Sequence, residues 1–157
     1  MITYHVSNLF SAEQKDCIIT HVCNNLRGWG AGFVVPLGNK YPLAREKYFQ
    51  TEKLILGTTQ IVPVDIENNV YVANMIAQTL GGKRPLFYNH LIDCMEEVGR
   101  FAETVNSKIY APLFGSKLAG GNWDFIEELM VDVWSKLDVH IYQLVGEVLR
   151  PDNHIIV

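Results

Sequence analysis

The chain has few of the features that mark disulfide-rich, metal-binding or membrane proteins. It contains only three cysteines, Cys17, Cys23 and Cys94, with no C-x-x-C spacing, which supports neither a disulfide framework nor a zinc site. No apolar run approaches the roughly 18 residues that cross a bilayer. The first residues also lack the basic and apolar segments of a signal peptide. We therefore expect a cytoplasmic protein without a membrane partner.

Basic residues are in deficit as well. Thirteen Lys and Arg against 17 Asp and Glu give a net charge of -4, which argues against a general nucleic-acid binder, because such proteins carry basic surfaces. A small anionic ligand remains possible, since a local cluster of backbone amides can bind one despite the net charge. The hydrophobic content of 48% and charged content of 19% are typical of a globular chain. We expect one domain covering residues 1–157, and a monomer.

Hydrophobic periodicity predicts strands alternating with helices. Strands are expected at 2–6, 17–22, 58–64, 70–77, 108–113 and 139–144, and helices at 32–39, 42–53, 85–105 and after Asn122. Residues 17–22 are apolar nearly throughout, as in a strand that is buried on both faces. The tail after Val148 can add an edge strand. This order predicts an α/β fold in which helices cover both faces of a mixed sheet.

Two glycine-rich loops each follow a strand and precede a helix. The first contains Gly28, Gly30 and Gly32, and the second runs from Phe114 to Gly121. Glycine lets the backbone approach a ligand closely, and the amides at the start of a helix attract anions. Open α/β sheets bind ligands at the carboxyl ends of their strands, where both loops would lie. The pattern favours a phosphate-containing ligand over glycines that only form tight turns.

A dinucleotide-binding fingerprint is a weaker interpretation of the first loop. That fingerprint needs a third glycine three residues after the second. Gly28 and Gly30 fit the first two places, but Phe33 occupies the third. Preference for NAD over other nucleotides would be needed to support this interpretation.

Several segments together resemble the macro domain. His21-Val-Cys-Asn24, Gly28-Trp-Gly-Ala-Gly32 and Lys40-Tyr-Pro42 resemble its first signature, in the branch that contains the ADP-ribose-1''-phosphate phosphatases. The segment from Pro112 to Trp123 is similar to the family's second loop, and the segment from Ile141 to Leu144 to its last core strand. The resemblance spans nearly the whole chain in the right order. It implies a three-layer α/β/α domain with a central mixed sheet and a cleft for ADP-ribose.

The resemblance also implies the site residues. His21 matches a histidine that is important for catalysis in the phosphatase branch, and we expect it to handle a proton, which suits imidazole near neutral pH. Asn24 matches the asparagine that orients the distal ribose, and is assigned to catalysis with His21. Ligand-binding residues are expected at Asn8, Leu9, Asn24, Gly28, Trp29, Gly30, Ala31, Gly32, Phe33, Gly115, Ser116, Lys117, Leu118, Ala119, Gly120 and Tyr142. No cofactor or metal is expected.

The chain departs from the family pattern at three places. The aspartate that accepts a hydrogen bond from the adenine amino group is Asn8 here, without the charge. Lys117 stands where a glycine is usual, and its ammonium group can reach a phosphate or narrow the cleft. The lysine and aspartate that remove ADP-ribose from macromolecules have no counterparts at Gln78-Thr79 and Ala119-Gly120. That mechanism is therefore not expected here.

Two functions from different classes remain open at this point. The first is an enzyme that removes the 1''-phosphate of ADP-ribose-1''-phosphate or hydrolyses a related derivative. The second is a module that binds ADP-ribose or an ADP-ribosylated macromolecule without turnover, which the lack of a strong acid/base pair favours. Plain structural roles also remain open, with His21 as a hydrogen-bonded core residue, Asn24 as a turn residue, and Trp29 and Tyr142 as packing residues.

Overall fold

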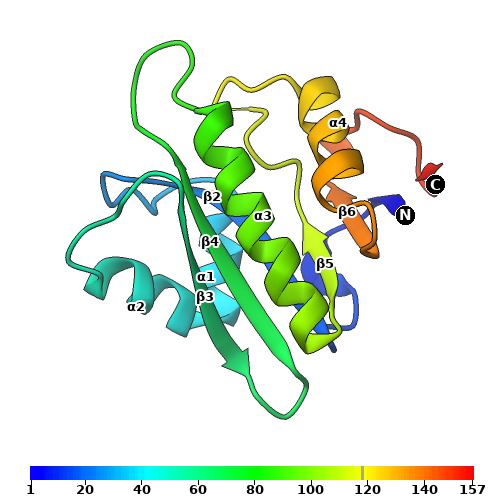
Figure 1. Ribbon diagram of the computed structural model, residues 1–157, viewed down its shortest axis with the longest axis horizontal. Coiled ribbons are helices and arrows are strands. Elements are labelled where there is room, and N and C mark those ends of the chain that lie inside the picture. Colours follow the sequence, from blue (N-terminus) through cyan, green and yellow to red (C-terminus); the bar gives the residue numbers. More distant parts are fainter. Residues whose placement is uncertain (118) are drawn as a thin grey trace.

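A computed structural model describes residues 1–117 and 119–157. Its strands are β1 (Ile2–Val6), β2 (Cys17–Asn24), β3 (Thr58–Asp65), β4 (Val70–Gln78), β5 (Lys108–Ala111), β6 (Val139–Gln143) and β7 (Ile155–Ile156). Its α-helices are α1 (Val34–Lys40), α2 (Pro42–Gln50), α3 (Tyr88–Val105) and α4 (Trp123–Val133), and two short 3₁₀ helices are η1 (Leu9–Ser11) and η2 (Val145–Glu147). The alternation that the sequence predicts is confirmed (Figure 1).

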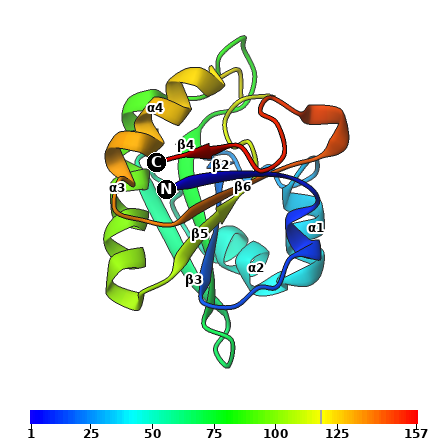
Figure 2. The same ribbon diagram turned by 90° about the vertical axis from the view of Figure 1, so that its right-hand side faces the viewer.

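The strands form one mixed sheet in the order β3-β4-β2-β5-β6-β1-β7. The five central strands run parallel, and β3 and β7 pair antiparallel at the two edges. Figure 2 shows α3 and α4 on one face of this sheet and α1 and α2 on the other, which is the predicted α/β/α arrangement. The two termini lie side by side, because β7 pairs with the first strand.

Strand β2 is central and carries the site. It is buried along its length apart from half-buried Val22, as its apolar sequence predicts, and it pairs with β4 on one side and β5 on the other. It extends two residues beyond the predicted end and includes Asn24. The register with β4 shifts between Cys23 and Asn24, and such a bulge bends the strand and changes the direction of its side chains. The chain therefore leaves the sheet irregularly at the start of the first glycine loop.

The predicted starts of two helices are wrong, and α2 ends at Gln50, three residues before its predicted end. Pro85 was expected at the first position of the long helix, but α3 begins at Tyr88. The carbonyl of Pro85 instead accepts a hydrogen bond from the Thr79 N–H at 3.0 Å and closes the base of a loop. The shorter helix begins at Val34 and not at Gly32, since Gly32 has a φ of +79°. Pro36 consequently falls in the first turn of α1, where proline is tolerated.

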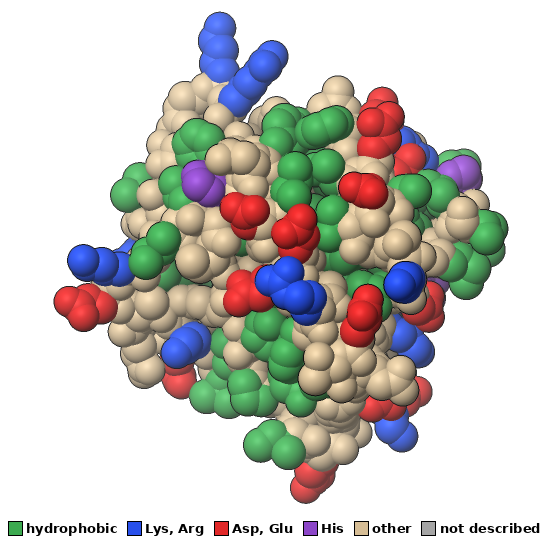
Figure 3. Space-filling model, in the orientation of Figure 1, with side chains coloured by type: hydrophobic (Ala, Val, Ile, Leu, Met, Phe, Trp, Pro, Cys, Tyr) green, Lys and Arg blue, Asp and Glu red, His purple; other side chains and the backbone are tan. Residues whose placement is uncertain are grey.

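The outer surface gives few functional clues. Acidic and basic side chains are mixed over the face seen in Figure 3, in keeping with the net charge of -4. In the described part of the chain, every helix is too short or too polar to cross a bilayer. The helix α4 starts as predicted, because the Asn122 side chain accepts a hydrogen bond from the Phe125 N–H at 3.2 Å.

Candidate functional site

A cleft of about 550 Å³ lies at the carboxyl ends of the parallel strands. Its wall is formed by the segments that follow β1, β2, β5 and β6, together with residues of the strands such as Gln78 at the end of β4. Both glycine loops contribute to it, the first through Ala31–Val34 and the second through Phe114, Gly115, Lys117 and Ala119. Ligand pockets are commonly about 300–1,000 Å³. The volume and position suit a small-molecule ligand between the loops.

The first glycine loop is organised by Asn24. Its Oδ1 accepts hydrogen bonds from the N–H groups of Leu26 and Gly28 and from the hydroxyl of Tyr48, all at 2.9 Å. Its Nδ2 donates to the Gly28 carbonyl, also at 2.9 Å. A Cβ at Gly28 would lie 2.9 Å from this amide, so the close approach requires glycine. The Asn24 side chain is therefore used by its own loop and does not line the cleft.

Arg27 fastens this loop to the end of α2. Its φ of +64° is uncommon for a residue with a side chain. The guanidinium donates to four backbone carbonyls, those of Tyr48, Phe49, Thr51 and Glu52, at 2.5–3.3 Å. A cation is favourable at the carboxyl end of a helix, where the carbonyls lack partners. This contact holds the loop in one position beside the cleft.

Replacing Arg27 with alanine is expected to lower the free energy of unfolding by about 1–3 kcal/mol, because hydrogen bonds from a charged donor are lost. Urea unfolding measures the change. Arg27→Lys is the matched control for charge: it keeps the cation but not the planar fork that reaches several carbonyls, so most of the loss should remain. Recovery of full stability in the lysine variant would contradict this geometry.

Aromatic side chains form one wall of the cleft. Phe10 of η1 and Phe33 of the first loop stack with ring centroids 5.4 Å apart, and both line the cleft. Phe33 and Trp29 also pack against His21, with centroids 5.7 and 5.6 Å from the imidazole. Trp29 itself is buried against Tyr48 and is not in the cleft wall. The sugar or base of a ligand would meet apolar ring surface here.

His21 is buried on β2 and still lines the cleft. Its Nε2 is hydrogen-bonded to Asn74 Oδ1 at 2.6 Å. Burial lowers the pKa of His21 from the ordinary 6.5 to about 4, and the hydrogen bond to Asn74 opposes this shift. The imidazole is consequently neutral at pH 7. It can therefore act as a general base, but it has no additional proton to donate as a general acid.

The buried histidine makes stability depend on pH. Because its pKa is 6.5 when unfolded and about 4 when folded, the unfolded chain binds more protons between these values. The contribution of His21 to the free energy of unfolding is fully present above pH 6.5 and is lost as the pH falls towards 4. The change is on the order of 3 kcal/mol, from about 2.5 pKa units at 1.36 kcal/mol each.

We therefore expect urea midpoints of the wild-type protein to fall between pH 7 and pH 4.5 more steeply than those of His21→Leu. The comparison separates the histidine from the carboxylates, which both proteins share. Equal slopes for the two proteins would contradict a neutral buried imidazole.

The second glycine loop is shaped by backbone contacts. Gly115 and Gly120 have φ values of +75° and +73°. The Gly121 N–H donates to the Gly115 carbonyl at 2.8 Å, and a Cβ at Gly121 would lie 2.3 Å from that oxygen. A Cβ at Gly120 would lie 2.5 Å from the carbonyl oxygen of Lys83. These glycines therefore allow backbone segments to pack where no side chain fits.

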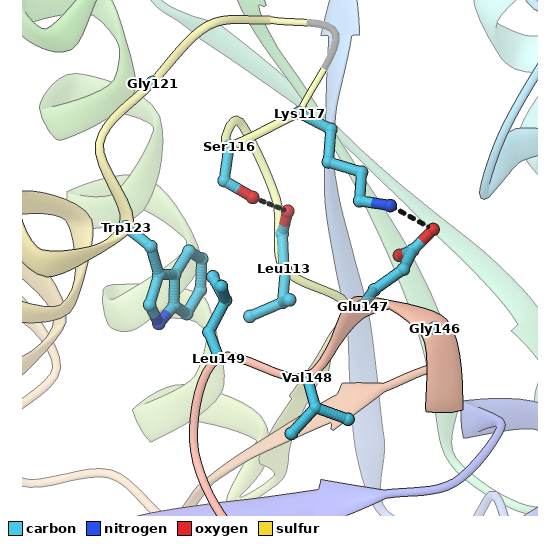
Figure 4. Close-up of a pocket in the computed structure, with 9 residues that line it drawn as sticks. All are labelled: Leu113, Ser116, Lys117, Gly121, Trp123, Gly146, Glu147, Val148 and Leu149. Atoms are coloured by element: carbon cyan, nitrogen blue, oxygen red, sulfur yellow. Dashed lines mark hydrogen bonds and ion pairs between the residues drawn. The ribbon is translucent and has the colours of Figure 1, made fainter.

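An ion pair crosses from the second loop to η2. Lys117 Nζ lies 2.5 Å from Glu147 Oε1, and both residues line the cleft. They also line a smaller cavity of about 340 Å³, whose other walls include Leu113, Trp123 and Leu149 (Figure 4). The ion pair thus stands between the two cavities. The smaller cavity is lined by residues of the second glycine loop but by none of the first, and His21 is not among its lining residues, so we assign the ligand to the larger cleft.

The far end of the cleft is formed by the segments after β1 and β6. The Asn8 side chain accepts a hydrogen bond from the Phe10 N–H at 2.9 Å and caps η1, while remaining exposed to the cleft. Leu9 and Tyr142 also line this end. Tyr142 stacks on His5, with ring centroids 4.5 Å apart, and its pKa is raised by burial. It is a packed wall residue with one part facing the cleft.

The structure brings together ten of the predicted site residues and leaves others aside. Those in the cleft wall are Asn8, Leu9, His21, Ala31, Gly32, Phe33, Gly115, Lys117, Ala119 and Tyr142. Outside it lie Asn24, Gly28, Trp29, Gly30 and Gly120, and Ser116 lines the smaller cavity. Leu118 lies outside the described residues. Direct ligand contacts by any of these residues stay predictions.

Sequence reasoning missed three polar residues near the cleft. Asn74 is fully buried in the middle of β4, between Ala73 and Met75. Gln78 ends the same strand and lines the cleft, as does Glu147 of η2. A polar residue inside an apolar strand is the signal that could have identified Asn74, since buried amides need partners. Glu147 had no such signal, because acidic residues are common in surface turns.

Solved structures match the chain over most of its length, and two of them are at least 30% identical to it. A protein of unknown function from Bacteroides thetaiotaomicron is 32% identical with a TM-score of 0.82, covering 92% of this chain and 98% of that one. A macrodomain protein from Streptomyces coelicolor is 30% identical with a TM-score of 0.75, covering 90% of this chain and 98% of that one. No protein-family model matches the chain.

More distant proteins share the fold. The ADP-ribose 1''-phosphate phosphatase of the yeast Lodderomyces elongisporus is 21% identical over 140 residues, covering 82% of this chain and 87% of the relative. A mutant macrodomain from Oceanobacillus iheyensis, solved with ADPR, is 12% identical with a TM-score of 0.67, covering 90% of this chain and 84% of that one. With the topology and the two-loop cleft, the match to the Streptomyces macrodomain shows that the chain belongs to the macrodomain family.

Proposed function

We propose that this macrodomain binds ADP-ribose derivatives in the cleft and removes the 1''-phosphate of ADP-ribose-1''-phosphate. The observation that carries the proposal is a single cleft of about 550 Å³ walled by both glycine loops and by His21. A related macrodomain has been solved with ADPR, and a distant relative is named for the phosphatase activity. ADP-ribose-1''-phosphate is the substrate that we propose from the wider class of ADP-ribose derivatives.

The two loops are suited to the diphosphate. Ala31 and Gly32 of the first loop and Gly115 and Ala119 of the second line the same cleft. Each amide that bonds a phosphate oxygen contributes about 1.5–3 kcal/mol. A few such bonds lead to a dissociation constant on the order of micromolar after the costs of association. Lys117 adds a cation at the second loop, opposite Glu147.

The reaction at the distal end needs one proton acceptor. Water attacks phosphorus, its oxygen forms the new bond, and the bond from phosphorus to the ribose oxygen breaks. His21 takes the proton of the attacking water, and the ribose oxygen leaves as a hydroxyl after protonation from solvent. The products are ADP-ribose and inorganic phosphate. General base catalysis of this kind contributes about 10²–10⁴-fold to a rate.

Calorimetry with ADP-ribose and with NAD tests the binding half of the proposal. We expect micromolar binding of ADP-ribose and much weaker binding of NAD, which carries an additional nicotinamide on the distal ribose. Preference for NAD would contradict the proposal. Phosphate release from ADP-ribose-1''-phosphate tests the catalytic half on the same samples.

A binding module without turnover is the second candidate, and one observation favours it. The Asn24 amide is occupied by its own loop, and His21 is largely sealed from solvent with one ring nitrogen already bonded. Both residues assigned to catalysis would then be structural. ADP-ribose binding with no turnover of ADP-ribose-1''-phosphate or of an acylated or macromolecular ADP-ribosyl adduct would establish this reading.

A further inference from the structure

A buried chain of hydrogen bonds connects α2 to His21 through Asn74. Asn74 lies on β4 directly opposite His21 in the parallel pair. Its Nδ2 lies 3.1 Å from the Ala44 carbonyl oxygen of α2 and 3.1 Å from Gln60 Oε1 of β3. Its Oδ1 lies 2.6 Å from His21 Nε2. Asn74 is completely buried, so these contacts are made without competition from water.

The Ala44 carbonyl fixes which way the Asn74 amide faces. A backbone carbonyl can only accept a hydrogen bond, so the atom of Asn74 that faces it must be the NH₂ group. The amide oxygen must then face His21. Because that oxygen can only accept, the His21 Nε2 must carry the proton. The neutral imidazole has one proton, so Nδ1 has none.

We propose that Asn74 is a positioning residue that holds His21 in the tautomer with Nε2 protonated, leaving Nδ1 as the base for phosphate removal. This inference rests on the proposed function. Among the described residues, the titratable group in contact with the ring is Cys23, whose Sγ lies 3.7 Å from Nε2 and 3.9 Å from Nδ1. Burial raises the pKa of that thiol, so it stays uncharged.

Apart from Cys23, Asn74 is the polar side chain that contacts the imidazole among the described residues. Trp29 and Phe33 cover the imidazole with apolar ring surface. Two features of the described residues set the pKa of His21: burial lowers it, and the hydrogen bond to Asn74 opposes that shift. Without Asn74, this tautomer would exchange with the alternative, in which Nδ1 carries the proton and the basic nitrogen is Nε2, the one that faces position 74. A single amide therefore decides which nitrogen of the histidine can accept a proton.

Nitrogen NMR of the imidazole in the wild-type protein tests the tautomer without any activity measurement. We expect a protonated Nε2 and an unprotonated Nδ1 at pH 7. In Asn74→Asp, a carboxylate replaces the amide, and we expect the pKa of His21 to rise so that both nitrogens are protonated near neutral pH. A wild-type protein with the proton on Nδ1 would overturn the inference, whether or not any variant folds.

Kinetics then test whether the tautomer matters. In Asn74→Leu, we expect kcat for phosphate release to fall at least tenfold, while KM stays within about threefold of the wild-type value. In Asn74→Asp, the acid limb of the pH–rate profile should move to higher pH. Gln60→Ala is the matched control: it removes the other partner of the Asn74 amide, leaves the Ala44 contact, and should keep the wild-type tautomer and profile.

The outcomes separate the two proposals. An unchanged kcat and pH profile in both Asn74 variants would overturn the positioning role while the phosphatase activity stands. A wild-type protein that shows the expected tautomer but no phosphate release would remove the phosphatase proposal and, with it, the catalytic part of the Asn74 role.

Discussion

Replacing His21 with alanine is expected to slow phosphate release from ADP-ribose-1''-phosphate by about 10²–10⁴-fold. The imidazole lines the cleft and is neutral at pH 7, and its removal takes away the proton acceptor that we assign to the attacking water. Affinity for ADP-ribose should change by only a few-fold, because the two glycine loops remain. Initial rates and calorimetry measure the two effects separately.

The variant needs a check of folding and a matched control. Without His21, the buried Asn74 Oδ1 loses its donor, which costs about 1–3 kcal/mol of stability. Rates should therefore be measured below the melting temperature of the variant. His90→Ala removes a histidine of α3 outside the cleft and should leave the rate unchanged. Wild-type turnover in His21→Ala would exclude the catalytic role.

Adding one methyl group at Gly121 is expected to weaken ADP-ribose binding at least tenfold. The Cβ of Gly121→Ala would lie 2.3 Å from the Gly115 carbonyl oxygen and 2.6 Å from Leu86 Cδ2. The backbone of the second loop must move to relieve the first contact, and Gly115 is itself in the cleft wall. Misplaced amides then lose bonds to phosphate oxygens, each contributing about 1.5–3 kcal/mol.

A glycine-to-alanine substitution at a position where the added Cβ meets no neighbouring atom is the control. A Cβ at Gly146 meets nothing within 4 Å, and this glycine lines the smaller cavity but not the cleft. Gly146→Ala should bind ADP-ribose within twofold of the wild-type protein. If Gly121→Ala bound as tightly as Gly146→Ala, the second loop would have no part in holding the ligand.

Much of this fold could be predicted from local sequence, for physical reasons that β2 illustrates. Its apolar run from Cys17 to Val22 predicts burial on both faces, and the strand is indeed central. The helix that starts after Asn122 was predicted from its cap, which the structure confirms. Boundaries failed where one backbone angle decided them, as at Gly32 with its φ of +79° and at Pro85, which closes a loop.

The site was less accessible to sequence reasoning because it depends on contacts between distant residues. Asn24 could be recognised from its motif, but not that Tyr48, 24 residues later, bonds both its carbonyl and its side chain. The pairing of His21 with Asn74 joins residues 53 positions apart. Sequence spacing carries no information about such a contact until the strand order is known.

The most direct test of the proposed function is phosphate release from ADP-ribose-1''-phosphate by the wild-type protein under initial-rate conditions. We expect ADP-ribose and inorganic phosphate in equal amounts, inhibition by added ADP-ribose, and a rate that depends on His21. Micromolar binding of ADP-ribose-1''-phosphate with no phosphate released at any pH between 5 and 9 would contradict the enzyme and leave a binding module.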